Sequence, residues 1–245
     1  MGLFEMREKA LASRKPLYDM FSEIPPRYDL INTIITLNMD RSWRQKAARE
    51  CLTGKPKRIL DLCCGTGDLA MSITRLAEHP AEVCGLDFSQ SMLEIAAEKS
   101  GAKGLKGITF TRADASLLPF ANASFDCIGI SFAFRNLTYK SPSVKDYLTE
   151  ILRVLEPGGR LVIAESSQPK SVLIRSVYHF YMRQWVFRIG WLISGNRQAY
   201  RYLAESCSRY YSPDELTELL LKLGFTQVRY TPFFFGVAGI FVATR

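Results

Sequence analysis

The fold of this chain is decided by one stretch, Asp61-Leu62-Cys63-Cys64-Gly65-Thr66-Gly67-Asp68-Leu69-Ala70. It begins as an apolar run that is typical of a buried strand, passes through two glycines and continues as a helical pattern. Glycine is needed at such a turn because a bound ligand approaches the backbone closely and because the turn uses backbone angles that other residues avoid. The stretch therefore predicts a strand, a ligand-binding turn and a helix in succession.

Short apolar runs alternate with connectors and amphipathic segments from residue 58 onward. The runs are RILDLCC (58–64), EVCGLD (82–87), ITFTRAD (108–114), FDCIGISF (125–132) and RLVIAES (160–166), followed near the end by FTQVRY (225–230) and AGIFVATR (238–245). This alternation predicts an α/β fold, a doubly wound and mostly parallel sheet of seven strands with helices on both faces. The last two strands, separated by Pro232 and a Phe-rich turn, can form a hairpin.

We expect a single domain over residues 1–245, because no low-complexity linker and no internal repeat divides the chain. Helical spacing after the Pro25-Pro26 break places Tyr28, Ile31 and Ile35 on one face. The expected parts are an N-terminal helical appendage (1–50), a cofactor-binding core (51–170), a helical lid inserted after the fifth strand (171–211) and a C-terminal helix with the final strand pair (212–245).

Basic charge gathers in two segments of this chain, whose formal net charge is +8. Residues 1–57 carry +4 and residues 168–211 carry +6, and the second segment also holds ten of the 29 aromatic residues. An aromatic and basic mixture suits nucleic acid or an anionic bilayer surface, and solvated arginines on an ordinary lid helix give the same pattern. No apolar run approaches the roughly 18 residues of a spanning helix and the N-terminus lacks an apolar signal core, so we expect a soluble, cytoplasmic protein.

The chain has few residues that could form a metal-binding site or a Ser-His-Asp catalytic triad. The six cysteines show no paired metal-ligand spacing, and there are only two histidines, His79 and His179. We therefore expect no metal site and no Ser-His-Asp triad.

Two aspartates after the glycine turn define the expected ligand. Asp87 ends the second strand 20 residues beyond Gly67, where a carboxylate accepts hydrogen bonds from ribose hydroxyls, and this alone fits NAD as well. Asp114 closes the third strand beside the expected adenine edge, where a dehydrogenase has no particular need of a carboxylate. No tyrosine-lysine pair or placed histidine is evident for the proton that accompanies hydride transfer, which disfavours a dehydrogenase.

With these residues assembled, the chain resembles the class I S-adenosylmethionine-dependent methyltransferases. The general resemblance rests on ILDLCCGTGD (59–68), GLDFS (85–89), RADASLLPFANASFD (112–126) and RVLEPGGRLVI (153–163). A narrower resemblance, to the ubiquinone/menaquinone biosynthesis C-methyltransferases, rests on YDLIN (28–32) running to Asp40 and Trp43, on SFAFRN (131–136) and on AYRYLAES (199–206). Asp40 stands where the family pattern often has histidine, and Ser166 where it usually has phenylalanine.

The resemblance implies S-adenosyl-L-methionine as the cofactor and assigns residues to it. The turn from Gly65 through Thr66 to Gly67 would meet the methionine end, Asp87 the ribose, and Asp114 with Ala115 the adenine, while Ser131 would close the site. Asp61, Asp68 and Phe88 complete the expected cofactor-binding set.

The resemblance also implies the reaction, C-methylation of a reduced demethylquinone with a polyprenyl tail, such as demethylmenaquinol. Arg135 is the candidate for stabilising oxyanion charge and Asn136 for orienting the ring. Three proton acceptors stay open: a water molecule held by Asn136, the carboxylate of Asp29, or the carboxylate of Asp40. Tyr28, Phe132 and Tyr202 are the expected substrate-binding residues, as pocket walls or hydrogen-bond donors.

A polyprenyl substrate predicts contact with the inner face of an anionic membrane, made by segment 172–193. Helical spacing places Ile174, Tyr178, Tyr181, Trp185, Ile189 and Leu192 on one apolar face, and Arg175, His179 and Arg183 on a polar stripe. A buried lid face would have the same spacing. A homodimer is compatible with the sequence, which does not require one.

Three other functions are alternatives to C-methylation of a demethylquinone. The first is a class I methyltransferase that acts on another lipid or small aromatic molecule. A nucleic-acid methyltransferase suits the charge, but no Asn/Asp-Pro-Pro-aromatic motif follows the fourth strand, so we expect no nucleic-acid partner. A membrane-surface protein that merely retains cofactor binding is disfavoured by the intact acids Asp61, Asp87 and Asp114.

Overall fold

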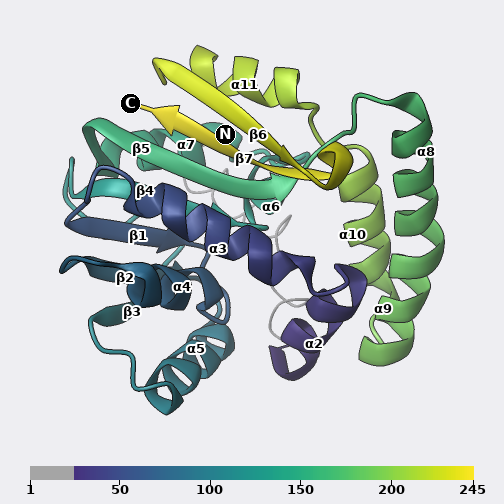
Figure 1. The fold of residues 1–245 in the computed structure, drawn as a ribbon, viewed down its shortest axis with the longest axis horizontal. Helices are drawn as coiled ribbons and strands as arrows, with labels where there is room; N and C mark the ends of the chain where they lie inside the picture. Colours follow the sequence, from purple (N-terminus) through teal and green to yellow (C-terminus); the bar gives the residue numbers. More distant parts are fainter. Residues whose placement is uncertain (1–24) are drawn as a thin grey trace, which may run out of the picture.

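A seven-stranded sheet forms the centre of the computed structural model, which describes residues 25–245, with side chains from residue 29 (Figure 1). The strands are β1 (Arg58–Leu62), β2 (Glu82–Asp87), β3 (Ile108–Arg112), β4 (Phe125–Ser131), β5 (Leu155–Ser166), β6 (Gln227–Phe233) and β7 (Ala238–Thr244). Their order is β3-β2-β1-β4-β5-β7-β6, and only β7 runs antiparallel to its neighbours. The predicted fold class is confirmed, including the final hairpin.

Helices cover both faces of the sheet and also extend beyond the carboxyl ends of its parallel strands (Figure 1). They are α2 (Pro25–Ile35), α3 (Met39–Leu52), α4 (Asp68–Leu76), α5 (Gln90–Ala102), α6 (Phe134–Thr138), α7 (Val144–Val154), α8 (Val172–Tyr181), α9 (Phe187–Ser194), α10 (Arg197–Ser208) and α11 (Pro213–Lys222). A π-helical turn (η1, Met182–Val186) joins α8 to α9, and a short 3-10 turn (η2, Phe234–Gly236) joins β6 to β7.

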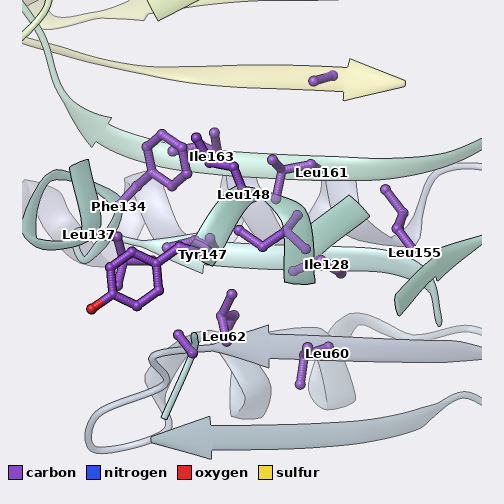
Figure 2. Packing of buried hydrophobic residues seen from close by; sticks show 14 of the residues in the cluster. Leu60, Leu62, Ile128, Phe134, Leu137, Tyr147, Leu148, Leu155, Leu161 and Ile163 are labelled. Carbon is purple, nitrogen blue, oxygen red and sulfur yellow. The ribbon is translucent and has the colours of Figure 1, made fainter. Parts of the chain in front are cut away.

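One face of the sheet packs against α7 in the larger of the hydrophobic clusters (Figure 2). Leu60 and Leu62 of β1 point to this face, because alternate residues of a strand share a face. Ile128 and Ile163 continue it across the sheet, and Leu148 of α7 covers it. These side chains are fully buried, so their packing fixes the parallel strands relative to one another.

Helix α3 covers the opposite face of the sheet. Ala47, Ala48 and Cys51 are fully buried against Ile59 of β1. Gly129 of β4 allows the close approach, because a Cβ atom there would lie 3.0 Å from the Sγ atom of Cys51. The helix runs through the boundary expected at residues 50 and 51, so its packing makes it part of the sheet cover and not of an appendage.

Helices α8, α9 and α10 follow β5 and stand beyond the carboxyl ends of the strands (Figure 1). The apolar face expected for this segment is partly wrong. Trp185 and Leu192 are 58% and 86% exposed, whereas Met182 and Val186 are buried. The π-helical turn is the reason, because it inserts an extra residue and rotates the helix after Tyr181.

Among the described residues, no helix combines the length and the apolar character that crossing a membrane requires. Pro232, expected between the last two strands, lies inside β6 opposite Gly239. An edge strand accepts proline because one side of its backbone has no partner strand. The Phe-rich turn that follows carries two left-handed residues, Phe234 (φ 39°) and Phe235 (φ 57°).

Candidate active site

A cavity lies at the carboxyl ends of β1, β2 and β4, where ligands bind in doubly wound sheets. Gly67 does not line it. The expected cofactor-binding residues that line this cavity, hereafter the cofactor cavity, are Asp61, Gly65, Thr66, Asp68, Asp87, Phe88, Asp114, Ala115 and Ser131. The structure therefore brings nearly all of that predicted set together, although their sequence positions span 70 residues.

The two glycines of the turn have different reasons to be glycine. Both hold left-handed backbone angles, with φ of 53° at Gly65 and 79° at Gly67. A Cβ atom at Gly65 would meet nothing within 4 Å, so its backbone faces open space. A Cβ atom at Gly67 would lie 3.0 Å from the Cβ atom of Ala96, so this glycine lets α4 approach α5. Gly65 is thus the position at which a ligand can approach the backbone.

Asp87 is held by the turn that it faces. Its Oδ2 atom accepts a hydrogen bond from the Gly65 N–H (2.9 Å) and its Oδ1 atom accepts one from the Ser89 N–H (2.9 Å). Burial raises the pKa of this carboxyl, and the backbone donors oppose that rise. The carboxylate lines the cofactor cavity, and each carboxylate oxygen can accept more than one hydrogen bond, so it can also accept from ligand hydroxyls.

Asp61 and Asp68 lie beneath the turn. Asp61 is 1% exposed and accepts a hydrogen bond from the Ala70 N–H (2.8 Å), and burial raises its pKa to about 8. Asp68 accepts from the Lys99 Nζ atom (2.6 Å) and its Oδ2 atom lies 3.8 Å from Arg44. A bound cation beside these carboxylates would favour the ionised form of Asp61.

At the other end of the cofactor cavity, Asp114 accepts two hydrogen bonds from Ser116, from its N–H (2.8 Å) and from its Oγ atom (2.6 Å). The Oγ atom of Ser131 is buried and has no hydrogen-bond partner among the described residues. A buried hydroxyl without a partner is uncommon in folded proteins and indicates a place where a ligand donates or accepts.

A second cavity, of about 590 Å³, adjoins the first, and we call it the apolar cavity. It lies between α2 and α3, the β6–β7 turn, and helices α8 to α10. Three residues line both cavities: Arg44, Phe132 and Asn136. Phe132 holds a left-handed φ of 57° and lies between Trp43 (ring centroids 5.9 Å apart) and the Arg44 guanidinium (5.6 Å). Chemistry between ligands of the two cavities must occur at this junction.

Arg135 lies in the wall of the apolar cavity and does not line the cofactor cavity. Its guanidinium is buried, hydrogen-bonds to the Ser206 Oγ atom and has its Nε atom 3.7 Å from the Glu165 Oε1 atom. That Nε–H has no hydrogen-bond partner among the described residues. Glu165 also accepts from the backbone N–H of Arg135 (3.0 Å) and from the N–H and Oγ of Ser166 (2.8 Å each).

The other candidates for catalysis and substrate binding lie in different places. Tyr202 donates its hydroxyl to the Asn136 Oδ1 atom (3.5 Å), and burial raises its pKa. Asp40 is buried and lines the apolar cavity. Asp29 lines neither cavity and accepts from Thr66 (2.8 Å) and Lys99 (2.7 Å). The side chain of Tyr28 lies outside the described residues.

Sequence reasoning gave no role to Arg44, Trp43 or Glu165. Arg44 stands four residues after Asp40 on one helix, a spacing at which opposite charges pair, and that signal was available. Nothing in the local sequence indicates that Glu165 pairs with Arg135, because the two residues come from different elements.

The fold and the cofactor cavity together define a class I methyltransferase that uses S-adenosylmethionine as its methyl donor. Within that class the chain belongs to the ubiE/COQ5 methyltransferase family, whose model matches residues 8–245.

Two relatives agree with the family assignment, and a solved structure shares the fold. A demethylmenaquinone methyltransferase of Thermus thermophilus is 45% identical over 92% of this chain and all of its own length. One of Deinococcus radiodurans is 42% identical over 93% of this chain and 91% of its own. A possible histamine N-methyltransferase of Thermotoga maritima shares the fold, with a TM-score of 0.61 and 19% identity over 93% of this chain and 99% of that chain.

The residues of the cofactor cavity fit S-adenosylmethionine. Gly65 offers an open backbone, Asp87 has two carboxylate oxygens for the ribose, and Ser131 offers a buried hydroxyl without a partner among the described residues. Carboxylates beneath the turn suit a donor that carries a positively charged sulfur.

Proposed function

We propose that this chain methylates a ring carbon of a reduced, polyprenylated demethylquinone, converting demethylmenaquinol to menaquinol. The observation that carries the proposal is the junction of the two cavities at Arg44, Phe132 and Asn136. The apolar cavity has the volume that pockets for drug-sized ligands have, so an aromatic ring with the first units of a tail fits in it. The names of the relatives from Thermus thermophilus and Deinococcus radiodurans support the same substrate.

When bound, S-adenosylmethionine supplies a methyl group on a positively charged sulfur. The protein contributes a mostly apolar cavity with a few polar groups that orient the ring. The Nε–H of Arg135 has no partner in the part of the chain that the structure describes, and we assign to it a hydrogen bond to a ring oxygen. We assign to Asn136 a second polar contact close to the junction. Aromatic walls at Phe132 and Tyr202 favour a flat ring.

The test is to incubate the protein with S-adenosylmethionine labelled in its methyl group and with reduced demethylmenaquinone, then to extract the lipid. Label in menaquinone supports the proposal. Parallel reactions with a benzoquinol precursor and with a simple phenol separate the naphthoquinol from other aromatic acceptors. Absence of label from every quinol, with S-adenosylmethionine binding intact, would overturn it.

We further propose that the protein draws its substrate from an anionic membrane surface. Five apolar side chains that line the apolar cavity are more than half exposed and form its rim: Leu37 (72%), Leu173 (74%), Val177 (60%), Phe234 (53%) and Phe235 (73%). They come from three separate segments. Residues with strained backbone angles persist only when their surroundings fix them, and Phe234 and Phe235 hold such angles at the rim.

The size of the cavity and nearby charge support a bilayer as the partner. A cavity of about 590 Å³ encloses only the first units of a long tail, so the remainder leaves through the apolar rim. Lys170 and Arg183 are exposed on the segment that carries Leu173 and Val177. Each such charge contributes about 1 kcal/mol at an anionic surface, which gives salt-sensitive attachment.

Co-sedimentation with vesicles that contain phosphatidylglycerol tests this contact. We expect binding at low salt, release at about 0.5 M salt, where the screening length is only a few ångströms, and loss of binding in Phe234→Ser/Phe235→Ser. Leu221→Ser is the matched control, because Leu221 is 44% exposed on α11 and does not line the cavity. Failure of the unaltered protein to bind, or equal binding by the rim variant, would refute the contact.

A further inference from the structure

The junction between the two cavities holds one charged residue, Arg44, beside Phe132 and Asn136. The carbon that receives the methyl group must lie at this junction, since donor and acceptor occupy different cavities. In a 1,4-dihydroxy ring, one oxygen is attached next to that carbon and the other lies across the ring. The near oxygen therefore lies beside Arg44, and the far oxygen reaches toward Arg135, which lines only the apolar cavity.

Asp40 is fixed beside Arg44 by two contacts. The Arg44 Nη1 atom hydrogen-bonds to its Oδ2 atom. The Thr36 hydroxyl lies 2.8 Å from its Oδ1 atom and shares its one proton between that atom and the Asn32 carbonyl oxygen (2.7 Å). Asp40 is 5% exposed and lines the apolar cavity. Each carboxylate oxygen can accept more than one hydrogen bond, so Asp40 can still accept from a ligand hydroxyl.

We propose that Asp40 accepts the hydroxyl proton of the near oxygen and that Arg44 stabilises the phenolate formed, an inference that rests on the proposed function. The O–H bond breaks, its proton moves to a carboxylate oxygen of Asp40, and its electron pair stays on the ring oxygen beside the guanidinium. That electron density makes the adjacent ring carbon the nucleophile that forms the bond to the methyl carbon, while the S–CH₃ electron pair stays on sulfur. The ring C–H proton is then lost to water, which restores the aromatic ring, and the hydroxyl proton returns from Asp40.

Other groups around the apolar cavity are poorer acceptors. The carboxylate of Glu165 is engaged by the backbone N–H groups of α6 and β5 and lies beside the guanidinium of Arg135. Burial raises the pKa of Tyr178 and of Cys207, which keeps both protonated at neutral pH. Asp40 lines the apolar cavity and is hydrogen-bonded to Arg44, the charged residue among the three that line both cavities.

The charges that face this pair come from neighbouring elements. Asp68 of α4 lies 3.8 Å from the Arg44 guanidinium, and Lys99 of α5 neutralises Asp68 from the other side. Across the apolar cavity, Arg135 of α6 and Glu165 of β5 are paired. Lys99 is also paired with Asp29 of α2 (2.7 Å), so two carboxylates share one ammonium group on this side. The Arg44 guanidinium is the cation that lines both cavities, beside Asp40.

The test uses the unaltered protein and two variants, Asp40→Asn and Arg44→Gln. Arg41→Gln is the control, because Arg41 is exposed on the same helix. The first measurement is the single-turnover rate of methyl transfer to reduced demethylmenaquinone, with S-adenosylmethionine affinity measured by calorimetry to verify folding. We expect each variant to lose about 10²-fold or more in rate, the scale of a lost acid-base or charge-stabilising group.

The second measurement separates catalysis from structure. 1-Naphthol bound in the apolar cavity is titrated by absorbance, which distinguishes its neutral and ionised forms. Arg44→Gln should raise the pKa of bound naphthol by about one unit or more, because a cation near the oxygen is lost, and Asp40→Asn should lower it, because an anion is lost. Both variants are slow, yet they shift this pKa in opposite directions, which a common packing defect would not do.

Each outcome decides something. Normal turnover by Asp40→Asn, or shifts of the naphthol pKa in the same direction, would overturn the assignment of the pair. If the unaltered protein methylates no quinol, the proposed function fails, whereas the naphthol titrations still show whether Arg44 and Asp40 act on a ring oxygen in this cavity.

Discussion

Replacing Asp87 by alanine should weaken S-adenosylmethionine binding more than any other single change at the glycine turn. The Asp87 carboxylate is fixed by the N–H groups of Gly65 and Ser89, each at 2.9 Å, and it lines the cofactor cavity. Two hydrogen bonds from ribose hydroxyls to a charged acceptor are worth about 1.5–3 kcal/mol each. Since about 1.4 kcal/mol is a factor of ten, we expect the dissociation constant to rise about 10²-fold or more.

Isothermal titration calorimetry measures this loss, and a matched variant controls for stability. Asp126 also accepts two backbone hydrogen bonds, from the N–H groups of Lys57 (2.8 Å) and Arg58 (2.7 Å). It lies near the amino end of β4, whereas the cofactor cavity lies at the carboxyl ends of the strands. Asp126→Ala should leave affinity within about threefold, well under 1 kcal/mol. The Asp87→Ala loss should recur with 5′-methylthioadenosine, which keeps the ribose. Unchanged binding by Asp87→Ala, or an equal loss in Asp126→Ala, would refute the reasoning.

Three further changes test the electrostatics and packing of the site. Burial raises the pKa of Asp61 to about 8, whereas in the unfolded chain the pKa lies near its ordinary value of about 4. The free energy of unfolding should therefore fall as the pH rises from about 4 to about 8. Asp61→Asn should flatten this pH dependence, which urea titrations at several pH values measure. Arg135→Met leaves Glu165 buried without its cation and should lower the free energy of unfolding by about 3–5 kcal/mol, as measured by chemical denaturation. Adding Glu165→Gln should recover most of that stability, while methyl transfer stays slow. Normal turnover by the double variant would contradict a substrate contact for Arg135. Gly190→Ala places a Cβ atom 2.0 Å from the ring of Tyr200 and should lower stability by about 1–3 kcal/mol, seen as a lower melting temperature; an unchanged melting temperature would show that α9 and α10 separate freely.

The parallel sheet and the cofactor cavity could be predicted from local patterns. Each strand of the core is a short apolar run, and Gly65 and Gly67 mark the turn after β1. Because parallel strands end at the same edge of a sheet, Asp61, Asp87 and Asp114 had to converge there, and the structure places all of them on one cavity. These features follow from the periodicity of short runs and from the glycine turn, which a single sequence displays within a few residues.

The apolar cavity could not be predicted in the same way. Its walls come from α2 and α3, from the β6–β7 turn and from α8 to α10, which are distant in the sequence and meet only through packing. The helical periodicity after residue 174 was misleading beyond Tyr181, because a π-helical turn rotated Trp185 outward and turned Met182 and Val186 inward. Periodicity gives the apolar face of a regular helix, and it has no signal for an inserted residue.

The sequence by itself therefore determined the class of the protein, the glycine turn and the acids that line the cofactor cavity, since each follows from a local strand, turn or helix. Tertiary structure alone decided which residues line the junction of the two cavities. Arg44 reaches the junction because α3 packs across the sheet, and Arg135 turns away from the cofactor because Glu165 and Ser206 hold its guanidinium in the apolar cavity. Such placements depend on long-range packing and charge pairing, whose energies arise only when the chain has folded.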